Sequence, residues 1–311
     1  MFLSLAATLA LGCTSSTTEG SIPWITSVDV AKATAAKEGK DLLINFTGSD
    51  WCGWCTRLDE EVFSHEEFVK AASEKFVFLY LDFPRGEEPK SKVVDAALND
   101  QLQADYTVGG FPSIILTDAE GRPYGRTGYQ AGGPAAYLEH LAELRETGQP
   151  IRDLVSAKKA TPEMVAKAFP LMADTDMLAY PGFAPFLKMA KKIDADGSKG
   201  WTKKILGAEQ NAEFKKLLDK NFGPDLIPDW EKLAAFIAKN EHISGNAFVQ
   251  IGMGCTQEYL VPNSKFAEAK AIFVRVKAEP MLAENDEAQK QLQAMIDDMD
   301  QKAKDAAGDD G

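Results

Sequence analysis

The sequence contains few cysteines and histidines for its length. Among its 311 residues there are four cysteines and three histidines. Four unevenly spaced cysteines are too few for a scaffold held together by disulfides. So small a set of thiols and imidazoles also leaves little with which to complete a metal site. We therefore expect no bound metal.

Positive charge is scarce as well. The 34 Lys and Arg residues face 47 Asp and Glu residues, which gives a formal net charge of −13. Such a chain repels phosphate backbones and anionic membrane surfaces, so we expect no nucleic-acid partner. Apolar residues make up 45% and charged residues 26%, which excludes wholesale disorder. The length predicts two domains.

The apolar run at the N-terminus is short. Residues 1–12 are almost wholly apolar, but a helix needs about 20 such residues to span a bilayer. The run is typical of a signal peptide. Cys13 and the polar stretch after it resemble a bacterial lipoprotein signal, in which the cysteine is lipidated and a flexible tether follows. Residues 1–21 are thus predicted to be a leader and tether.

Two departures leave an alternative open. No Lys or Arg precedes the apolar run, and Ala10 stands where lipoprotein signals usually carry Leu. An ordinary cleaved signal with an incidental Cys13 therefore remains possible. In both cases we expect the mature protein to act outside the cytoplasm, either anchored by lipid on the periplasmic side of a membrane or secreted.

Residues 22–148 alternate between helix and strand signals. Apolar runs predict buried strands, Gly39 is placed to end a helix, and Ser64 with Glu67 forms a capping-box pattern. The expected order is helix 29–40, strand 41–47, helix 65–73, strand 76–83, helix 91–103, hairpin 113–127 and helix 133–147. This order predicts an α/β domain with a mixed sheet and helices on both faces.

Cys52 and Cys55 carry the chemistry. They are separated by two residues and follow a predicted strand where a helix should begin. At this spacing the two thiols can form a disulfide across the first helical turn. The helix N-terminus would favour the thiolate of Cys52, which makes it the candidate nucleophile, with Cys55 as the resolving thiol. The same spacing is also half of a zinc site or a structural pair.

The wider context resembles the thioredoxin family. The carrying motifs are LLINFTGSDWCGWC, the later YTVGGFPSIILTDAEGRP, and Gly128 before the last helix. The resemblance implies a thioredoxin fold that performs thiol–disulfide exchange without a cofactor. It also implies a cis-Pro112 opposite the disulfide, which would leave the backbone of Phe111 free to pair with an extended substrate. Trp51 and Trp54 would pack the segment that carries the two cysteines (residues 51–55, the motif loop), contact substrate, or do both.

The chain departs from thioredoxin in three ways. Asn45 stands where the family has a buried aspartate, and an amide cannot accept a proton from the resolving thiol. We therefore propose Asp50 or Asp59 for that role. Trp54 replaces the proline of thioredoxin or the histidine of strong oxidases, and residues 84–103 insert extra helix before Pro112.

The charges around the motif predict the direction of electron flow. Asp50 precedes the cysteines, three acidic residues occupy 59–61, and Arg57 is the only nearby base in the sequence. Carboxylates near Cys52 would raise the pKa of its thiol, and a less stabilised thiolate makes a more reducing couple. We therefore expect a reductase or isomerase.

Residues 149–311 contain no second CxxC motif. Apolar positions recur at helical spacing, which predicts an α-helical domain. Its segments weakly resemble the helical hairpins of tetratricopeptide-type repeats and suggest a platform for protein contact. Residues 194–200 lack the later Glu of a calcium loop and are predicted to form a turn. Cys255 is predicted to be a buried, inert thiol, and the charged C-terminal helix to end in a frayed acidic tail.

Two functions follow from these observations. The first is an extracytoplasmic oxidoreductase that acts on protein disulfides and dithiols and exchanges electrons with a separate donor or acceptor. The alternative is a binding or scaffold lipoprotein of the same fold, in which the disulfide staples a loop and the helical domain contacts a protein partner.

Overall fold

The computed structural model describes residues 22–175, 177–222 and 226–308, and these residues form two compact units. The N-terminal unit comprises the described residues up to Gln103 together with Val108–Arg152. The helical unit comprises Ala104–Thr107 and the described residues from Asp153 onward. No helix among the described residues is long and apolar enough to cross a membrane. The predicted leader, tether and lipidated Cys13 lie outside the described residues.

The described part of the N-terminal unit is built on a four-stranded mixed sheet with the order β2-β1-β3-β4. The central strand β1 runs parallel to β2 and antiparallel to β3, and β3 forms a hairpin with β4. Every residue of β1 is buried, as expected for a continuous apolar run at the centre of a sheet. The strands are β1 Asp41–Thr47, β2 Phe76–Asp82, β3 Ser113–Thr117 and β4 Pro123–Thr127.

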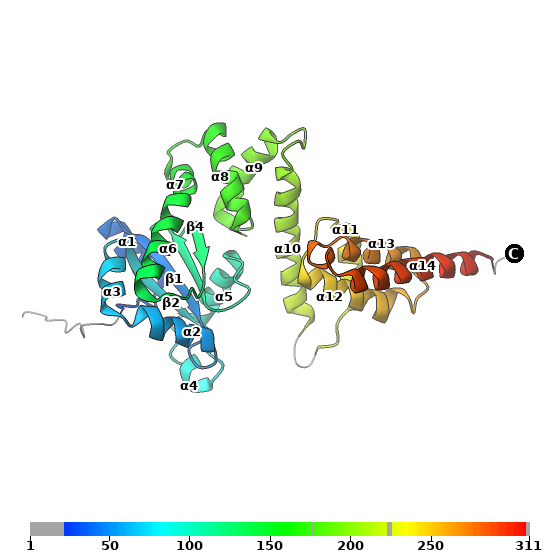
Figure 1. Cartoon of the computed structure of the whole chain (residues 1–311), viewed down its shortest axis with the longest axis horizontal. Helices are drawn as coiled ribbons and strands as arrows, with labels where there is room; N and C mark the ends of the chain where they lie inside the picture. Colours follow the sequence, from blue (N-terminus) through cyan, green and yellow to red (C-terminus); the bar gives the residue numbers. More distant parts are fainter. Residues whose placement is uncertain (1–21, 176, 223–225, 309–311) are drawn as a thin grey trace, which may run out of the picture. The chain divides into compact units, whose positions relative to one another are not determined.

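Helices flank this sheet, and α3 and α6 lie next to each other (Figure 1). Phe68 of α3 and Tyr137 of α6 meet with ring centroids 6.0 Å apart. The first helix stops at Gly39, which has a positive φ of 66° that suits glycine. The predicted mixed α/β fold is confirmed. The helical segments are α1 Val28–Glu38, α2 Gly53–Leu58, η1 Asp59–Phe63, α3 Glu66–Ser73, α4 Glu87–Lys90, α5 Ala96–Asp105, α6 Gly133–Thr147 and α7 Gln149–Ser156.

The capping box predicted at Ser64 and Glu67 is wrong. A turn of π-helix continues α2 through Phe63, so Ser64 ends that segment in a helical conformation instead of opening α3 in an extended one. The Ser64 hydroxyl donates to the carbonyl of Glu60 at 3.1 Å. His65 precedes α3 without a side-chain capping hydrogen bond. The capping pattern was overridden because the chain is already helical before it reaches Ser64.

A buried carboxylate ties α6 and α7 to the sheet. Asp41 opens β1 and is 6% exposed. Its carboxylate accepts hydrogen bonds from Tyr124 Oη at 2.7 Å, Arg145 Nε at 3.0 Å and Arg152 Nη2 at 3.1 Å. Because Arg152 lies on α7, the compact N-terminal unit continues past Gly148, where the sequence boundary was placed.

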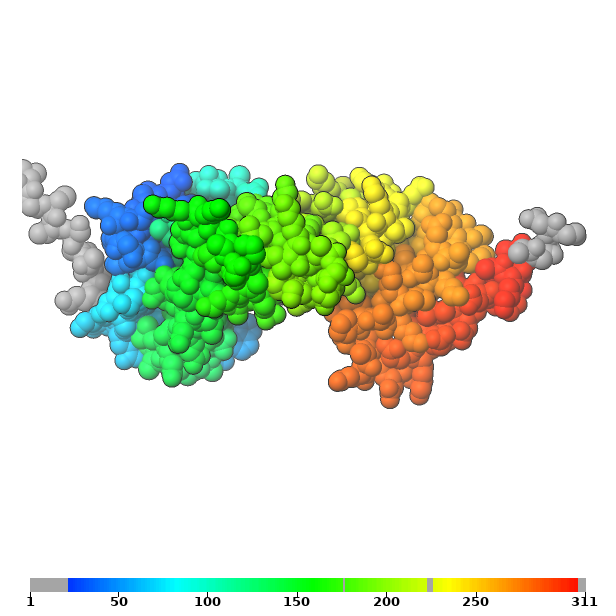
Figure 2. Space-filling view, turned by 90° about the horizontal axis from the view of Figure 1, so that it is seen from above, coloured from blue at the N-terminus to red at the C-terminus, as the bar shows by residue number. Residues whose placement is uncertain are grey.

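The helical unit is mostly α-helical, as predicted. The Asp194 carboxylate accepts the backbone N–H groups of Lys199 and Thr202 at 2.8 and 2.9 Å, so this turn is closed by its own backbone. The last turns of α14 project beyond the neighbouring helices of this unit (Figures 1 and 2). The helices are α8 Pro162–Asp174, α9 Ala184–Ile193, α10 Trp201–Asn221, α11 Trp230–Lys239, α12 Asn246–Cys255, α13 Phe266–Lys277 and α14 Asp286–Gly308.

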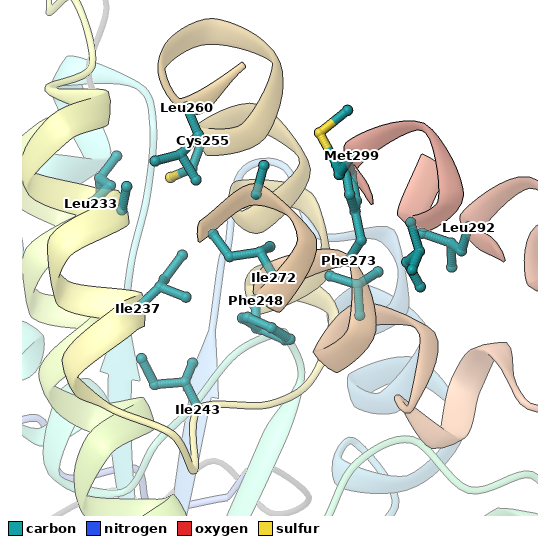
Figure 3. Close-up of a cluster of buried hydrophobic side chains, with 14 of the residues drawn as sticks. Leu233, Ile237, Ile243, Phe248, Cys255, Leu260, Ile272, Phe273, Leu292 and Met299 are labelled. Carbon is teal, nitrogen blue, oxygen red and sulfur yellow. The ribbon is translucent and has the colours of Figure 1, made fainter. Parts of the chain in front are cut away.

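The core of the helical unit joins side chains from α10 to α14. Figure 3 shows Cys255 among these apolar side chains, next to Leu260. The Cys255 thiol is fully buried and unpaired by any disulfide, and burial raises its pKa to about 12. The predicted burial of this thiol is confirmed, and a thiol in such surroundings is a poor nucleophile.

Candidate active site

The central strand delivers the cysteine motif to the start of a helix. Cys52 is the N-cap of α2 in an extended conformation, and its Sγ accepts the backbone N–H of Cys55 at 3.2 Å. The two cysteines form a disulfide and are 6% and 8% exposed. The start of a helix, with a backbone N–H group directed at this sulfur, favours a negative sulfur once the pair is reduced.

Trp51 packs the motif loop and remains 38% exposed. Its Nε1 donates to the carbonyl of Phe83 at 2.9 Å. The indole lies so close to Gly48 that a Cβ at this position would fall 2.4 Å from the ring. Only glycine therefore allows Trp51 to occupy this position. Both roles considered for Trp51, packing the loop and contacting substrate, are compatible with this geometry.

The second tryptophan is the more exposed of the two. Trp54 is 56% exposed and lies against Tyr129, with ring centroids 5.1 Å apart. The Arg57 guanidinium lies 5.5 Å from the Trp54 ring and 5.2 Å from the Tyr129 ring. Arg57 donates to Glu61 at 2.6 Å, and the Tyr129 hydroxyl donates to the same carboxylate at 2.5 Å. The charge of Arg57 is thus balanced within its own cluster.

The segment before β3 that holds Phe111 and Pro112 (the proline loop) meets the motif loop through aromatic contacts. The peptide bond between Phe111 and Pro112 is cis, as the family resemblance implies, and β3 begins directly after it. The Phe111 ring contacts Trp51 edge-on at a centroid distance of 5.6 Å. Gly128 leaves room beside this loop, since a Cβ there would lie 3.0 Å from the Pro112 carbonyl oxygen. Phe111, Pro112 and the motif loop are therefore brought together.

The central strand carries no ionisable group where the family has its buried acid. Asn45 is 5% exposed, and within the described residues its Oδ1 accepts no hydrogen bond. The buried carboxylate of this strand is Asp41, which opens the strand and already binds Tyr124 and two arginines. Sequence reasoning did not single out Asp41, although a charged residue that opens an apolar run was an available signal.

The two candidate proton acceptors lie in different environments. Asp59 follows Cys55 by four residues and donates its backbone N–H to the Cys55 carbonyl, so both lie on one helix face. Partial burial and, second, the neighbouring Glu60 raise the pKa of Asp59. The Asp50 carboxylate instead accepts the N–H groups of Gly86 and Arg85, at 2.6 and 3.0 Å, and these bonds lower its pKa. Of the two, Asp59 therefore lies on the helix face of Cys55, and its pKa is shifted in the direction of a stronger base.

A second cation lies near the motif. The guanidinium of Arg85 stands 3.9 Å from the centre of the Trp51 ring. The sequence expectation that Arg57 is the only nearby base is therefore wrong. Arg85 was missed because it is far from the cysteines along the chain and reaches Trp51 only when the loop after β2 folds back onto the motif loop.

No group of three or more His, Cys, Asp or Glu side chains in the described ranges is arranged to hold a metal ion. What the site does hold is a disulfide at a helix start, a cis-proline whose neighbour Phe111 contacts Trp51, and a partly exposed aromatic rim. This arrangement is chemically suited to exchange between a dithiol and a disulfide.

Residues 28–144 match the family of thioredoxin-like domains, in agreement with the fold and the site. The N-terminal unit thus contains a thioredoxin-like domain, over the part of the chain that this match covers.

Among known proteins, the chain is 36% identical over 109 residues to the disulfide bond reductase DsbH of Chlamydia pneumoniae, a match that covers 34% of this chain and 62% of that protein. It is 25% identical over 182 residues to the thioredoxin-related protein DsbJ of Chlamydia pneumoniae, covering 56% of this chain and 48% of that protein. A solved structure of a DsbH oxidoreductase matches with 30% identity and a TM-score of 0.36, covering 45% of this chain and 95% of that chain. The chain thus spans less than two thirds of either curated relative.

Proposed function

We propose that this protein is a thiol–disulfide oxidoreductase that reduces or isomerises protein disulfides outside the cytoplasm. The observation that carries the proposal is the Cys52–Cys55 disulfide at a helix start, joined through Trp51 and Phe111 to a cis-proline loop. The similarity of the same region to a protein named a disulfide bond reductase supports the reducing direction.

The reaction proceeds by two exchanges. In the reduced protein, the Cys52 thiolate attacks one sulfur of a substrate disulfide, which breaks that bond, forms a mixed disulfide and releases the other substrate sulfur as a thiolate. Cys55 then attacks the Cys52 sulfur and releases the second substrate sulfur. The substrate gains two electrons, the protein regains its disulfide, and a separate dithiol donor must reduce it again.

Asp59 is the proposed acceptor of the Cys55 proton. A carboxylate with a raised pKa is a better base than an ordinary aspartate, and Asp59 shares a helix face with Cys55. Asn45 cannot take this role because an amide has no basic oxygen. Phe111 is proposed to pair its backbone with an extended substrate segment, with Trp51 and Trp54 as the apolar contacts on either side.

The location rests on the sequence alone. An apolar leader followed by Cys13 and a polar tether favours a lipid anchor on the periplasmic side of a membrane. A disulfide-exchanging protein also has substrates in oxidising compartments, where structural disulfides form. The helical unit is proposed to bind a protein partner.

Reduction of insulin in the presence of dithiothreitol tests the activity. We expect the wild-type protein to accelerate insulin reduction, and the matched Cys52→Ser, Cys55→Ser double variant to give only the uncatalysed rate. If wild type and variant give the same rate, the disulfide only staples the loop and the protein is a thioredoxin-fold scaffold.

A further inference from the structure

We propose that Arg85 selects substrates, favouring disulfide-bonded segments that carry a carboxylate side chain next to the cysteine attacked by Cys52. This inference rests on the proposed function, because it concerns which disulfides the same site accepts. Arg85 is a specificity residue in this proposal and takes no part in the transfer of electrons.

The position of Arg85 places it where a substrate segment would lie. Its guanidinium is 3.9 Å from the centre of the Trp51 ring, and Trp51 directly precedes Cys52. The same indole contacts Phe111 at the start of the cis-proline bond. Arg85 therefore lies against the side chain that joins the two segments between which an extended substrate would be held.

The loop that carries Arg85 is fixed without using the guanidinium. The Asp50 carboxylate accepts the backbone N–H groups of Arg85 and Gly86, and the Phe83 carbonyl accepts the Trp51 indole N–H. These bonds join the side chains of Asp50 and Trp51 to backbone groups of the loop after β2. The side chain of Arg85 is exposed and lies against Trp51, and its guanidinium N–H groups donate no hydrogen bond within the part of the chain that the structure describes.

Arg85 differs from the cations that follow it in the chain, because those have a carboxylate within ion-pair distance and its guanidinium, in the described residues, has none. On the adjoining α4 segment Glu87 pairs with Lys90 and Glu88 with Lys92, at 2.8 and 2.5 Å. Across the described residues, Arg85 forms no ion pair of its own. The charge of Arg85 lowers the pKa of Asp50, but less than the backbone N–H groups of Gly86 and Arg85 that donate to the Asp50 carboxylate.

Stacking on Trp51 leaves Arg85 suited to bind a carboxylate. A guanidinium that lies over an aromatic face keeps its charge, and its N–H groups point outward in one plane that matches a carboxylate. Arg57 on the Trp54 side is already paired with Glu61. We therefore expect the preference for acidic residues to come from Arg85, and Arg57 provides a matched control.

Disulfide peptides with single substitutions test this inference. Three synthetic peptides, each with one internal disulfide, would carry Glu, Gln or Lys directly before one of the two cysteines. A second set of three would carry the same residues directly after that cysteine. The pre-reduced full-length protein is mixed with each peptide, and its oxidation is followed by tryptophan fluorescence. Each rate is divided by the rate of the same peptide with dithiothreitol, which corrects for its intrinsic reactivity.

We expect the Glu peptide to react about 3- to 5-fold faster than the Gln peptide, in one of the two placements, and the Lys peptide to react most slowly. Arg85→Gln should abolish this order, Arg85→Lys should keep part of it, and Arg57→Gln should leave it intact. High salt should reduce the preference, because screening weakens exposed charge pairs.

The outcomes separate the two proposals. If wild-type protein reacts with none of the peptides above the background rate, the proposed function itself fails. If it reacts with all of them at equal corrected rates, or if the Glu preference survives in Arg85→Gln, the specificity role of Arg85 is overturned and the oxidoreductase activity stands.

Discussion

Replacing Asp41 with Asn should destabilise the N-terminal unit without touching the cysteines. The carboxylate binds Tyr124, Arg145 and Arg152 through both of its oxygens while only 6% exposed. Asparagine keeps the shape but removes the negative charge and turns one acceptor into a donor that faces donors. Burial and, second, the neighbouring Asp41 raise the pKa of Tyr124, so its hydroxyl remains a donor that needs this acceptor.

The expected loss follows from the bonds that are removed. Hydrogen bonds to charged groups contribute about 1.5 to 3 kcal/mol each, and breaking a buried ion pair costs about 3 to 5 kcal/mol. Both arginine side chains are 25% exposed, and water can partly replace the lost partner. We therefore expect the free energy of unfolding of this unit to fall by about 2 to 4 kcal/mol.

Hydrogen exchange of the backbone amides measures this locally. The slowest amides of β1 and β3 report the unfolding free energy of the N-terminal unit separately from that of the helical unit. Asp29→Asn is the matched control, because Asp29 is exposed in the first turn of α1 and its loss should change stability by less than about 0.5 kcal/mol. An Asp41→Asn variant that behaves like this control would refute the reasoning.

Four further predictions concern the proposed activity and location. Cys52→Ser should abolish exchange, whereas Cys55→Ser should accumulate mixed disulfides that mass spectrometry detects; normal turnover by Cys55→Ser would contradict the assigned roles. Asp59→Asn should slow resolution of the mixed disulfide about 100-fold and flatten its pH profile in single-turnover kinetics, whereas Asp50→Asn should leave that profile unchanged. The reduction potential, measured by equilibration with glutathione, should lie closer to thioredoxin's roughly −270 mV than to about −120 mV, and a value above about −150 mV would indicate a disulfide donor. In cells, a fatty-acid label should appear on the wild-type protein and be absent from Cys13→Ser; persistence of the label in the variant would exclude lipidation at this residue.

The elements that depend on local pattern could be predicted from the sequence. The apolar run of β1 identified the central strand, and the cysteine spacing after it identified the helix start. The apolar run after Pro112 located β3, whereas the cis bond before it was implied by the family resemblance. The strands and the helix start are each encoded within a few neighbouring residues, which is why local pattern was sufficient for them.

The features that were missed depend on contacts between distant parts of the chain. Asp41 meets partners at positions 124, 145 and 152, and Arg85 reaches Trp51 only through the folded loop after β2. No local pattern specifies which distant cation a carboxylate will meet. The error at Ser64 has a different cause, since a correct local signal for a helix start was overridden by the π-helical turn that precedes it.

The two ends of β1 have different roles. One end holds the charged cluster that stabilises the fold, and the other end leads into the cysteine motif. Asp41 and its arginines lie at the beginning of the strand, and the cysteine motif follows its end. Seven residues of extended chain span roughly 20 Å, about twice the distance over which 0.1 M salt screens a charge. The negative charge of Asp41 is also balanced where it lies. Substitutions that strengthen or weaken this cluster should therefore change the stability of the unit with little effect on the chemistry of Cys52.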